Sequence, residues 1–417
     1  MKITIHNLGP VTDIVVKPSA FTVLMGEQAS GKSTVAKCVF FFCTVKDDIR
    51  EYILRKRRME PIELIEFLQK KLSGLFGKML RMKSDMELTC QYAKGVEIKV
   101  SLVDMVHHIS LSQKLANKLE KNGFKGDKAT LQQQLDVFFQ DDYDTVFIPA
   151  SRYLAAQLSL PINYMYASMG DDLRNGLDYA TQKFFETMFL CRISLGNITD
   201  ELPILKMNGH LDASFEKWLQ DIEALQKGRY AYVNGEERLY LPGEPLDGGK
   251  YILLYLASSG QQELVWLMNI ATYRLNTYIR ASRRTMFIIE EPETHLYPAA
   301  QKKLMELLAF VANHSQGMFI TTHSPYVLGS LNNLLYAGSR PKKFKKKIAE
   351  IIPEAYQLKH IDAFYLKDGG MEAAIDDEIK PLIQNGLIDD ASHELNDAFD
   401  GMIDIQFKSE EGHALSK

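Results

Sequence analysis

The sequence predicts an α/β fold in which a mainly parallel sheet is flanked by helices, with an antiparallel β subdomain and helical insertions. Two observations predict the sheet. The apolar runs at residues 285–289 and 317–321 are uninterrupted, as is typical of strands covered on both faces. A third apolar run, at residues 21–25, leads into a glycine-containing loop and then a helix-like segment at 32–42. Strands that alternate with helices in this way are characteristic of α/β domains.

Composition places the chain among ordinary globular proteins. Of its 417 residues, 46% are apolar and 24% are charged, which excludes a disordered or fibrous class. The net charge of -4 gives no global reason to expect nucleic acid. The four cysteines form no CxxC pair, which suits a reducing compartment and disfavours structural zinc.

The N-terminal residues alternate like a strand and contain no signal-peptide core. The longest apolar stretch, at residues 39–45, is far shorter than the roughly 20 residues that a membrane-spanning helix needs. We therefore expect a cytoplasmic protein without a membrane segment.

The first half of the chain adds helices and a hairpin to the strand at 21–25. Residues 46–84 are charged and helix-favouring, with apolar residues at helical spacing, so they predict a helical insertion. Period-2 alternation at 86–102 predicts a hairpin. An apolar strand at 145–148 then leads into the turn Pro149–Arg152.

In the second half, we expect a helical arm at about 155–228 and a hairpin at 230–241 with Asn-Gly at its centre. A strand at 251–256 and a helix at 261–275 follow. We assign residues 1–340 to one domain. Residues 341–417, basic at first and then acidic, predict a small helical region.

The loop after the first buried strand fits the pattern G-x-x-x-x-G-K-[ST] and stands between a predicted strand and a helix, the context that the pattern requires. Its backbone N–H groups can surround an anion, its lysine can contact β- and γ-phosphates, and its serine hydroxyl can ligate Mg²⁺. The motif therefore predicts a nucleoside triphosphate site rather than a simple helix cap. The predicted nucleotide-binding residues are Gly26, Glu27, Gln28, Ala29, Ser30, Gly31, Lys32, Ser33 and Thr34.

Two adjacent carboxylates, Glu290 and Glu291, end the buried strand at 285–289. Ligands of open α/β sheets collect at the carboxyl edge of the strands. We predict that Glu290 holds the metal, together with Ser33, and that Glu291 orients and deprotonates the attacking water. The alternative is an acidic helix start favoured by the helix dipole.

A Ser-Ser-Gly turn opens the helix that precedes these carboxylates by about thirty residues. Such a turn can present hydroxyl and N–H groups to an anion. The phosphate-binding loop at residues 26–33 (the P-loop) already binds the chain's own nucleotide, so we predict that this turn faces the nucleotide of another subunit. A plain helix cap is the alternative. The residues are Ser258, Ser259, Gly260, Gln261, Gln262 and Glu263.

A histidine, His323, follows the buried strand at 317–321. Its position after a strand predicts that it lies at the same sheet edge, near a γ-phosphate. A histidine there can also be a capping residue, but the order of motifs favours a γ-phosphate sensor.

These four motifs, in the order P-loop, Ser-Ser-Gly, Glu-Glu and histidine, resemble those of ATP-binding-cassette ATPases of the RecF, SMC and OLD kind. The run IEEPETHLYP, at residues 289–298, is especially similar to OLD-type and related bacterial AAA-family ATPases. The resemblance implies hydrolysis of ATP with Mg²⁺. It also implies a homodimer that sandwiches two ATP molecules, in which Ser259 and Gly260 of one subunit reach the phosphate bound to Lys32 of the other. The segment 292–297 would then be the D-loop, which connects the two sites.

The sequence departs from the family in several places. Glu27-Gln28-Ala29 stands where Pro-Asn-Gly is common, and Glu290 replaces an aspartate. The Pro149–Arg152 turn is a better Q-loop candidate than Gln91, and we assign Arg152 no role beyond a nucleotide or interface contact. Fewer than 100 residues follow His323, so we expect no Toprim nuclease. Sustained heptads are absent, which argues against a long coiled coil.

Three functions remain open. The family analogy favours an ATP-driven switch that acts on a separately encoded effector in bacterial anti-phage defence. A RecF-like DNA-repair ATPase is the second, in which the basic runs at 55–58 and 342–347 contact phosphates, although such runs are more often solvated. The third is a nucleotide-gated scaffold with little turnover.

Overall fold

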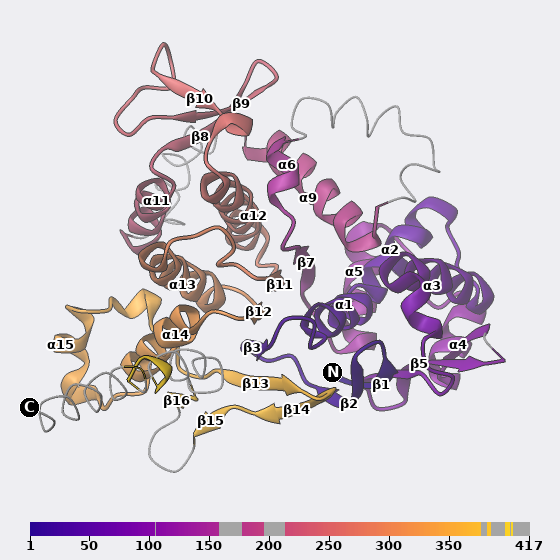
Figure 1. Cartoon of the computed structure of the whole chain (residues 1–417). Helices are drawn as coiled ribbons and strands as arrows, with labels where there is room; N and C mark the ends of the chain where they lie inside the picture. The colour runs from indigo at the N-terminus through magenta and orange to yellow at the C-terminus, as the bar shows by residue number, and fades with distance from the viewer. Residues whose placement is uncertain are drawn as a thin grey trace, which may run out of the picture.

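The computed structural model describes residues 1–104, 106–157, 177–195, 213–376, 382–384, 397–400 and 402. A six-stranded sheet lies at the centre of this part of the chain (Figure 1). Its five parallel strands and one antiparallel edge strand confirm the predicted α/β class. In spatial order they are β14 (Gly370–Ala373), β13 (Asp362–Lys367), β3 (Phe21–Gly26), β12 (Gly317–Thr322), β11 (Thr285–Glu290) and β7 (Asp144–Ile148).

Both faces of the central sheet are covered, which explains its uninterrupted apolar strands. Every residue of β3, β11 and β12 is buried. Alternate side chains of β11 enter opposite cores: Phe287 and Ile289 join one hydrophobic cluster, and Met286 and Ile288 join the other. The parallel pairing therefore needs helices on both sides, as the sequence predicted.

Helices from different parts of the chain build the two cores. The core that contains Phe287 takes residues from α9 (Tyr179–Leu195), α11 (Ala213–Gln226), α12 (Ser259–Ala281), α13 (Pro298–Asn313) and α14 (Pro325–Gly338). The core that contains Met286 takes residues from α1 (Lys32–Cys43), α2 (Val45–Lys56), α3 (Pro61–Phe76), α4 (Gln113–Glu120) and α5 (Lys128–Phe139). The helices α2 and α3 occupy the segment where we expected a helical insertion.

An antiparallel sheet extends the second core. It contains β2 (Val11–Val16), β1 (Lys2–Leu8), β4 (Glu87–Ala93), β5 (Val96–Val103) and β6 (Val106–Leu111), in that spatial order. The predicted antiparallel subdomain is thus confirmed, and β4 and β5 form the hairpin expected at 86–102. The short helix η1 (Gly77–Arg81) connects α3 to this sheet.

A small three-stranded sheet stands at the far end of the molecule, at the top of Figure 1. It consists of β8 (Arg229–Val233), β9 (Glu236–Tyr240) and β10 (Tyr251–Leu253). The strand expected at 251–256 is shorter than predicted, because its second half forms the 3₁₀ turn η2 (Leu254–Leu256). The short helix α6 (Tyr153–Gln157) begins the expected helical arm, of which residues 158–176 and 196–212 lie outside the described part.

The region beyond residue 340 differs from the expected helical one. It begins with short helices, η3 (Lys342–Phe344), α15 (Lys345–Ala349) and η4 (Glu354–Tyr356), but its strand β13 then pairs in parallel with β3 of the central sheet. The helical expectation is therefore wrong for residues 362–373. Two further short strands, β15 (Ile375–Asp376) and β16 (Leu382–Ile383), pair with each other. Most of the predicted acidic stretch lies outside the described residues.

Among the helices of the described residues, none combines the length and the apolar character that crossing a bilayer requires.

The pairing of β13 predicts that residues 341–417 cannot be removed. Their loss strips β13 from β3 along the register from Asp362–Thr22 to Leu366–Gly26, and it exposes an apolar strand edge. We expect truncation after residue 340 to give an aggregated protein or a clearly lowered midpoint of thermal unfolding. Truncation after residue 384 keeps β13 and is the control. A stable, soluble 1–340 fragment would contradict the pairing.

Candidate nucleotide-binding site

The P-loop needs its two glycines for steric reasons. It connects the end of β3, at Gly26, to the start of α1, at Lys32. Gly26 and Gly31 have φ angles of 153° and 105°, which side chains rarely adopt. A Cβ atom on Gly26 would lie 2.7 Å from the carbonyl oxygen of Leu366, and one on Gly31 would lie 2.9 Å from Val11. The turn is thus packed tightly against both β13 and the antiparallel sheet.

Lys32 is held inside this turn. Its Nζ donates hydrogen bonds to the carbonyl oxygens of Gly26, at 2.8 Å, and Glu27, at 2.7 Å. Burial lowers the pKa of Lys32, while the nearby carboxylates of Glu291 and Glu293 act in the opposite direction. The loop therefore holds a cation on the side of the sheet edge where the carboxylates lie.

The parallel order of the sheet brings the distant motifs together. The strands β11 and β12 end at Glu290 and Thr322, next to the end of β3. A cavity of about 740 Å³ opens at this edge. Its lining includes Glu291 and His323 together with six of the predicted nucleotide-binding residues, and it continues along Gly9, Pro10, Met79 and Met82, which sequence reasoning missed. The six are Gln28, Ala29, Gly31, Lys32, Ser33 and Thr34.

Glu291 and His323 form a charged pair in this cavity. Oε1 of Glu291 lies 3.5 Å from Nδ1 of His323. The interaction with His323 lowers the pKa of Glu291, and the same carboxylate raises the pKa of His323. Glu291 therefore stays ionised near neutral pH, as a group that accepts a hydrogen bond from water must. Glu293 fixes the histidine backbone by accepting hydrogen bonds from His323 N, at 3.2 Å, and from Thr322 Oγ1, at 2.6 Å.

Glu290 lies behind the cavity and fits a metal-holding role. It is 5% exposed, and burial raises its pKa while the nearby Ser33 side chain lowers it. Its Oε2 accepts a hydrogen bond from Ala150 N, at 3.4 Å, but its Oε1 is buried without a hydrogen-bond partner among the described residues. Such an orphaned oxygen next to a serine hydroxyl suits Mg²⁺. Because no group of three or more His, Cys, Asp or Glu residues in the described part could hold a metal, phosphate and water would complete the coordination.

The Ser-Ser-Gly turn lies at the start of α12 and outside this cavity. Ser258 caps the helix: its Oγ accepts from Gln261 N at 3.4 Å, and the Gln261 side chain accepts from Ser258 N at 3.2 Å. None of residues 258–263 lines the P-loop cavity. A Cβ atom on Gly260 would lie 2.9 Å from the carbonyl oxygen of His295, so the turn packs on the predicted D-loop.

Two of the six predicted signature residues are not available to another subunit. Gln262 is 3% exposed and donates to the carbonyl oxygens of Ala257 and Tyr255, at 2.9 and 3.1 Å. Glu263 is fully buried and forms an ion pair with Arg152. The prediction that both side chains face a second nucleotide is wrong, because the second half of the motif forms the inner face of α12.

Arg152 is the residue whose importance the sequence analysis did not recognise. Its guanidinium is fully buried behind Glu290 and Glu291 and donates to backbone carbonyls of both. The only sequence signal was its place in the turn after β7, directly beside β11. A lone arginine in a turn does not reveal which carbonyl groups it reaches.

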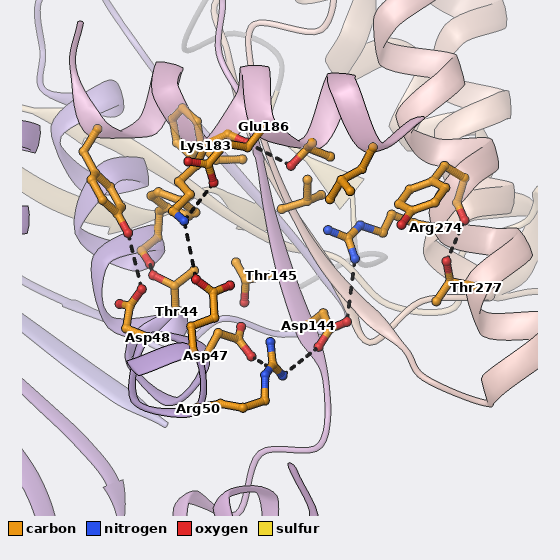
Figure 2. Close-up of a pocket in the computed structure, with 18 of the residues that line it drawn as sticks. Thr44, Asp47, Asp48, Arg50, Asp144, Thr145, Lys183, Glu186, Arg274 and Thr277 are labelled. Carbon is orange, nitrogen blue, oxygen red and sulfur yellow. Dashed lines mark hydrogen bonds and ion pairs between the residues drawn. The ribbon is translucent and has the colours of Figure 1, made fainter. Parts of the chain in front are cut away.

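A second cavity, of about 360 Å³, lies between α1, α2, β7, α9 and α12 (Figure 2). It shares no lining residue with the P-loop cavity. Figure 2 shows its charges in pairs: Arg50 contacts Asp47 at 2.9 Å, and Arg274 contacts Asp144 at 3.6 Å. Arg50 also lies 3.9 Å from Asp144, so these side chains link α2 to β7 of the sheet.

Comparison with known proteins agrees with this geometry. Residues 194–328 match a family model described as "AAA ATPase domain". This segment is therefore similar to an AAA ATPase domain. The matched segment contains the Ser-Ser-Gly turn, Glu290, Glu291 and His323, whereas the P-loop lies before it. The search of curated proteins found no significant match.

Solved structures similar to this chain include heads of SMC proteins. The "SMC head domain from Thermotoga maritima" is 13% identical, with a TM-score of 0.34, and the alignment covers 89% of this chain and 97% of that one. An Smc head domain with an extended coiled coil, bound to the C-terminal domain of ScpA derived from Pyrococcus furiosus, is 14% identical with a TM-score of 0.37, covering 89% and 94%.

The cavity of Figure 2 predicts a pH dependence of stability. Burial raises the pKa of Asp47 from its usual 3.8 to about 7. Between pH 3.8 and about 7, the folded protein keeps this proton while the unfolded chain loses it. The free energy of unfolding therefore falls as pH rises through this range, and above about pH 7 the contribution of Asp47 no longer changes. In Asp47→Asn, the slope of unfolding free energy against pH should become less negative in this window, by up to about 1.4 kcal/mol per pH unit.

Urea unfolding at several pH values across the window measures this slope. The exposed Asp142→Asn is the control and should leave the profile unchanged. An Asp47→Asn profile parallel to that of the unmodified protein would show that Asp47 does not titrate in this range.

Proposed function

We propose that this chain is an ATPase that binds ATP and Mg²⁺ at the P-loop and hydrolyses ATP between two copies of itself. One observation carries the proposal: Lys32, Glu291 and His323, which are distant in the sequence, line a single cavity. An ammonium, a carboxylate and an imidazole group around one phosphate-binding turn suit phosphoryl transfer to water. Catalysis of this reaction depends mainly on positioning the reactants and stabilising charge.

Each residue has a task that its surroundings support. The P-loop N–H groups and Lys32 would bind the phosphates, and Ser33 and Glu290 would hold Mg²⁺, which would supply positive charge against the phosphate. Glu291, kept ionised by His323, orients the attacking water and accepts its proton. His323, whose pKa is raised by Glu291, would donate a hydrogen bond toward the γ-phosphate.

A second copy of the chain would complete the site. The first four residues of the signature, Ser258 to Gln261, lie outside the chain's own P-loop cavity, and the N–H groups of Ser259 and Gly260 in the first turn of α12 have no intrahelical acceptor. Such a turn can bind the γ-phosphate of another subunit, and reciprocal contacts of this kind close in a two-fold dimer.

The cycle of dimer closure and opening would act as a switch on a separately encoded effector, in bacterial anti-phage defence. This finer role rests on the resemblance of IEEPETHLYP to OLD-like ATPases. Exposed cations favour nucleic acid as a second candidate: Lys343, Lys345, Lys346 and Lys347 are all solvent-exposed around η3 and α15. Salt-dependent DNA binding that disappears when these lysines are neutralised would favour the second candidate.

Replacing Glu291 by glutamine should abolish most ATP turnover and leave nucleotide binding unchanged. The amide keeps the size of the side chain but cannot accept a proton, so kcat should fall by roughly 10²- to 10⁴-fold. Phosphate release measures turnover and a fluorescent ATP analogue measures binding. The exposed Glu97→Gln is a matched control. Equal rates for Glu291→Gln and the unmodified protein would leave the nucleotide-gated scaffold as the function.

Mixing two inactive variants tests the composite site. Lys32→Met removes the P-loop cation, and Ser259→Arg blocks the signature turn, so each variant alone should be inactive. In a mixed dimer, one site combines an intact P-loop with an intact signature, and activity should reappear on mixing. Absence of recovery, with both variants folded and Ser259→Arg still binding ATP, would exclude a shared site.

A further inference from the structure

We propose that Arg152 is a positioning residue that holds Glu291 in its working conformation and couples it to the signature helix α12. The inference rests on the proposed function, because it concerns the residue that we assign as the base. Arg152 does not line the P-loop cavity, so it acts through Glu291 rather than on the nucleotide.

The two Nη atoms of the Arg152 guanidinium donate hydrogen bonds to backbone carbonyls of two turns, and Nε forms an ion pair with a residue of α12. Nη1 donates to the carbonyl oxygens of Pro149, at 3.2 Å, and Glu290, at 3.0 Å. Nη2 donates to those of Glu291 and Pro292, both at 3.1 Å. Nε lies 2.7 Å from Oε2 of Glu263. The side chain thus holds three consecutive carbonyls that surround the predicted base.

The turn at Glu291 needs such support. Glu291 has a φ angle of 41°, in the left-handed region that non-glycine residues avoid, and this conformation must be stabilised by its surroundings. On β12, Glu291 N donates to Thr321 O at 3.0 Å. The carbonyl oxygen of Glu291 accepts from Thr294 N and Oγ1, at 3.1 and 2.8 Å, and from Arg152. Without Arg152, this carbonyl keeps only the donors of Thr294 within the same turn, and the turn can relax away from the cavity.

The fifth contact leads to the signature. Glu263 lies one helical turn beyond Ser259 on α12, and its side chain is 1% exposed. Its other oxygen, Oε1, lies 3.4 Å from Nδ1 of His295 in the predicted D-loop, on which Gly260 packs. A movement of the α12 N-terminus, when the signature binds the nucleotide of another subunit, therefore displaces the partner of Arg152 and with it the Glu291 turn.

The ion pair of Arg152 and Glu263 is better explained by a positioning role than by a contribution to packing. A buried ion pair is costly to desolvate and is weak evidence for stability. Burial raises the pKa of Glu263, and the charge of Arg152 opposes this shift. Only the planar fork of arginine can reach a carboxylate and a row of carbonyls together, and lysine cannot replace it.

The test compares Arg152→Lys, which keeps the charge but loses the fork, with Arg192→Lys. Arg192 is another buried arginine in an ion pair, with Glu237 at 2.7 Å, and it lies outside the P-loop cavity. We expect Arg152→Lys to lower kcat by about 10- to 100-fold with an unchanged KM, because a small displacement of a reacting group has this effect. Arg192→Lys should leave both constants unchanged at a comparable unfolding midpoint.

A double variant separates positioning from a general structural role. If Arg152 acts through Glu291, Arg152→Lys should cause no further loss in a Glu291→Gln background, measured by single-turnover hydrolysis. An additional tenfold loss in the double variant, or wild-type kcat in Arg152→Lys, would overturn the inference. If Arg152→Lys does not fold, Glu263→Gln takes its place in the same cycle with the same expectation.

The outcomes also distinguish this inference from the proposed function. If Glu291→Gln hydrolyses ATP normally, the assigned base is wrong and the proposed function fails. If Glu291→Gln is inactive while Arg152→Lys and Glu263→Gln are fully active, the function stands and the positioning role of Arg152 is wrong.

Discussion

The parallel pairing of β3, β12 and β11 is the constraint on which the rest of the structure depends. Because the three strands run in the same direction, their carboxyl ends meet at one edge, and each end carries a different chemical group. Gly26 begins the phosphate loop, Thr322 precedes His323, and Glu290 precedes Glu291. The chain needs no long-range loop to assemble these groups. The sheet does so through its hydrogen-bond register, and the two covering cores hold it in place.

Charge within this edge is arranged in opposed pairs. Glu291 and His323 each shift the pKa of the other toward the charged form, whereas burial lowers the pKa of Lys32 and raises that of Glu290. Glu291 and His323 thus favour each other's charged form. The charged forms of the more deeply buried Lys32 and Glu290 would gain from a ligand of the opposite charge, a polyphosphate for Lys32 and a metal ion for Glu290.

The sequence was sufficient for features that depend on local order. Gly26 and Gly31 can be predicted because their φ angles and close contacts exclude other residues, and Glu290 and Glu291 because a buried strand ends there. The sequence did not reveal contacts between residues that are far apart in the chain. Arg152 meets carbonyls about 140 positions away, and β13 joins β3 after more than 300 intervening residues. No periodicity within either segment carries that information.

The signature motif shows the same division within six residues. Its first part, from Ser258 to Gln261, forms a capped helix start, whose hydrogen bonds can be inferred from residue types alone. Gln262 and Glu263 lie on the buried face of α12. Gln262 donates to the loop before α12, and Glu263 forms an ion pair with Arg152, which lies behind Glu291. A motif that looks uniform in sequence thus joins the start of α12 to the buried pair of Glu263 and Arg152 behind Glu291. In the proposed dimer, this continuity would give the two nucleotide sites a physical route by which each influences the other.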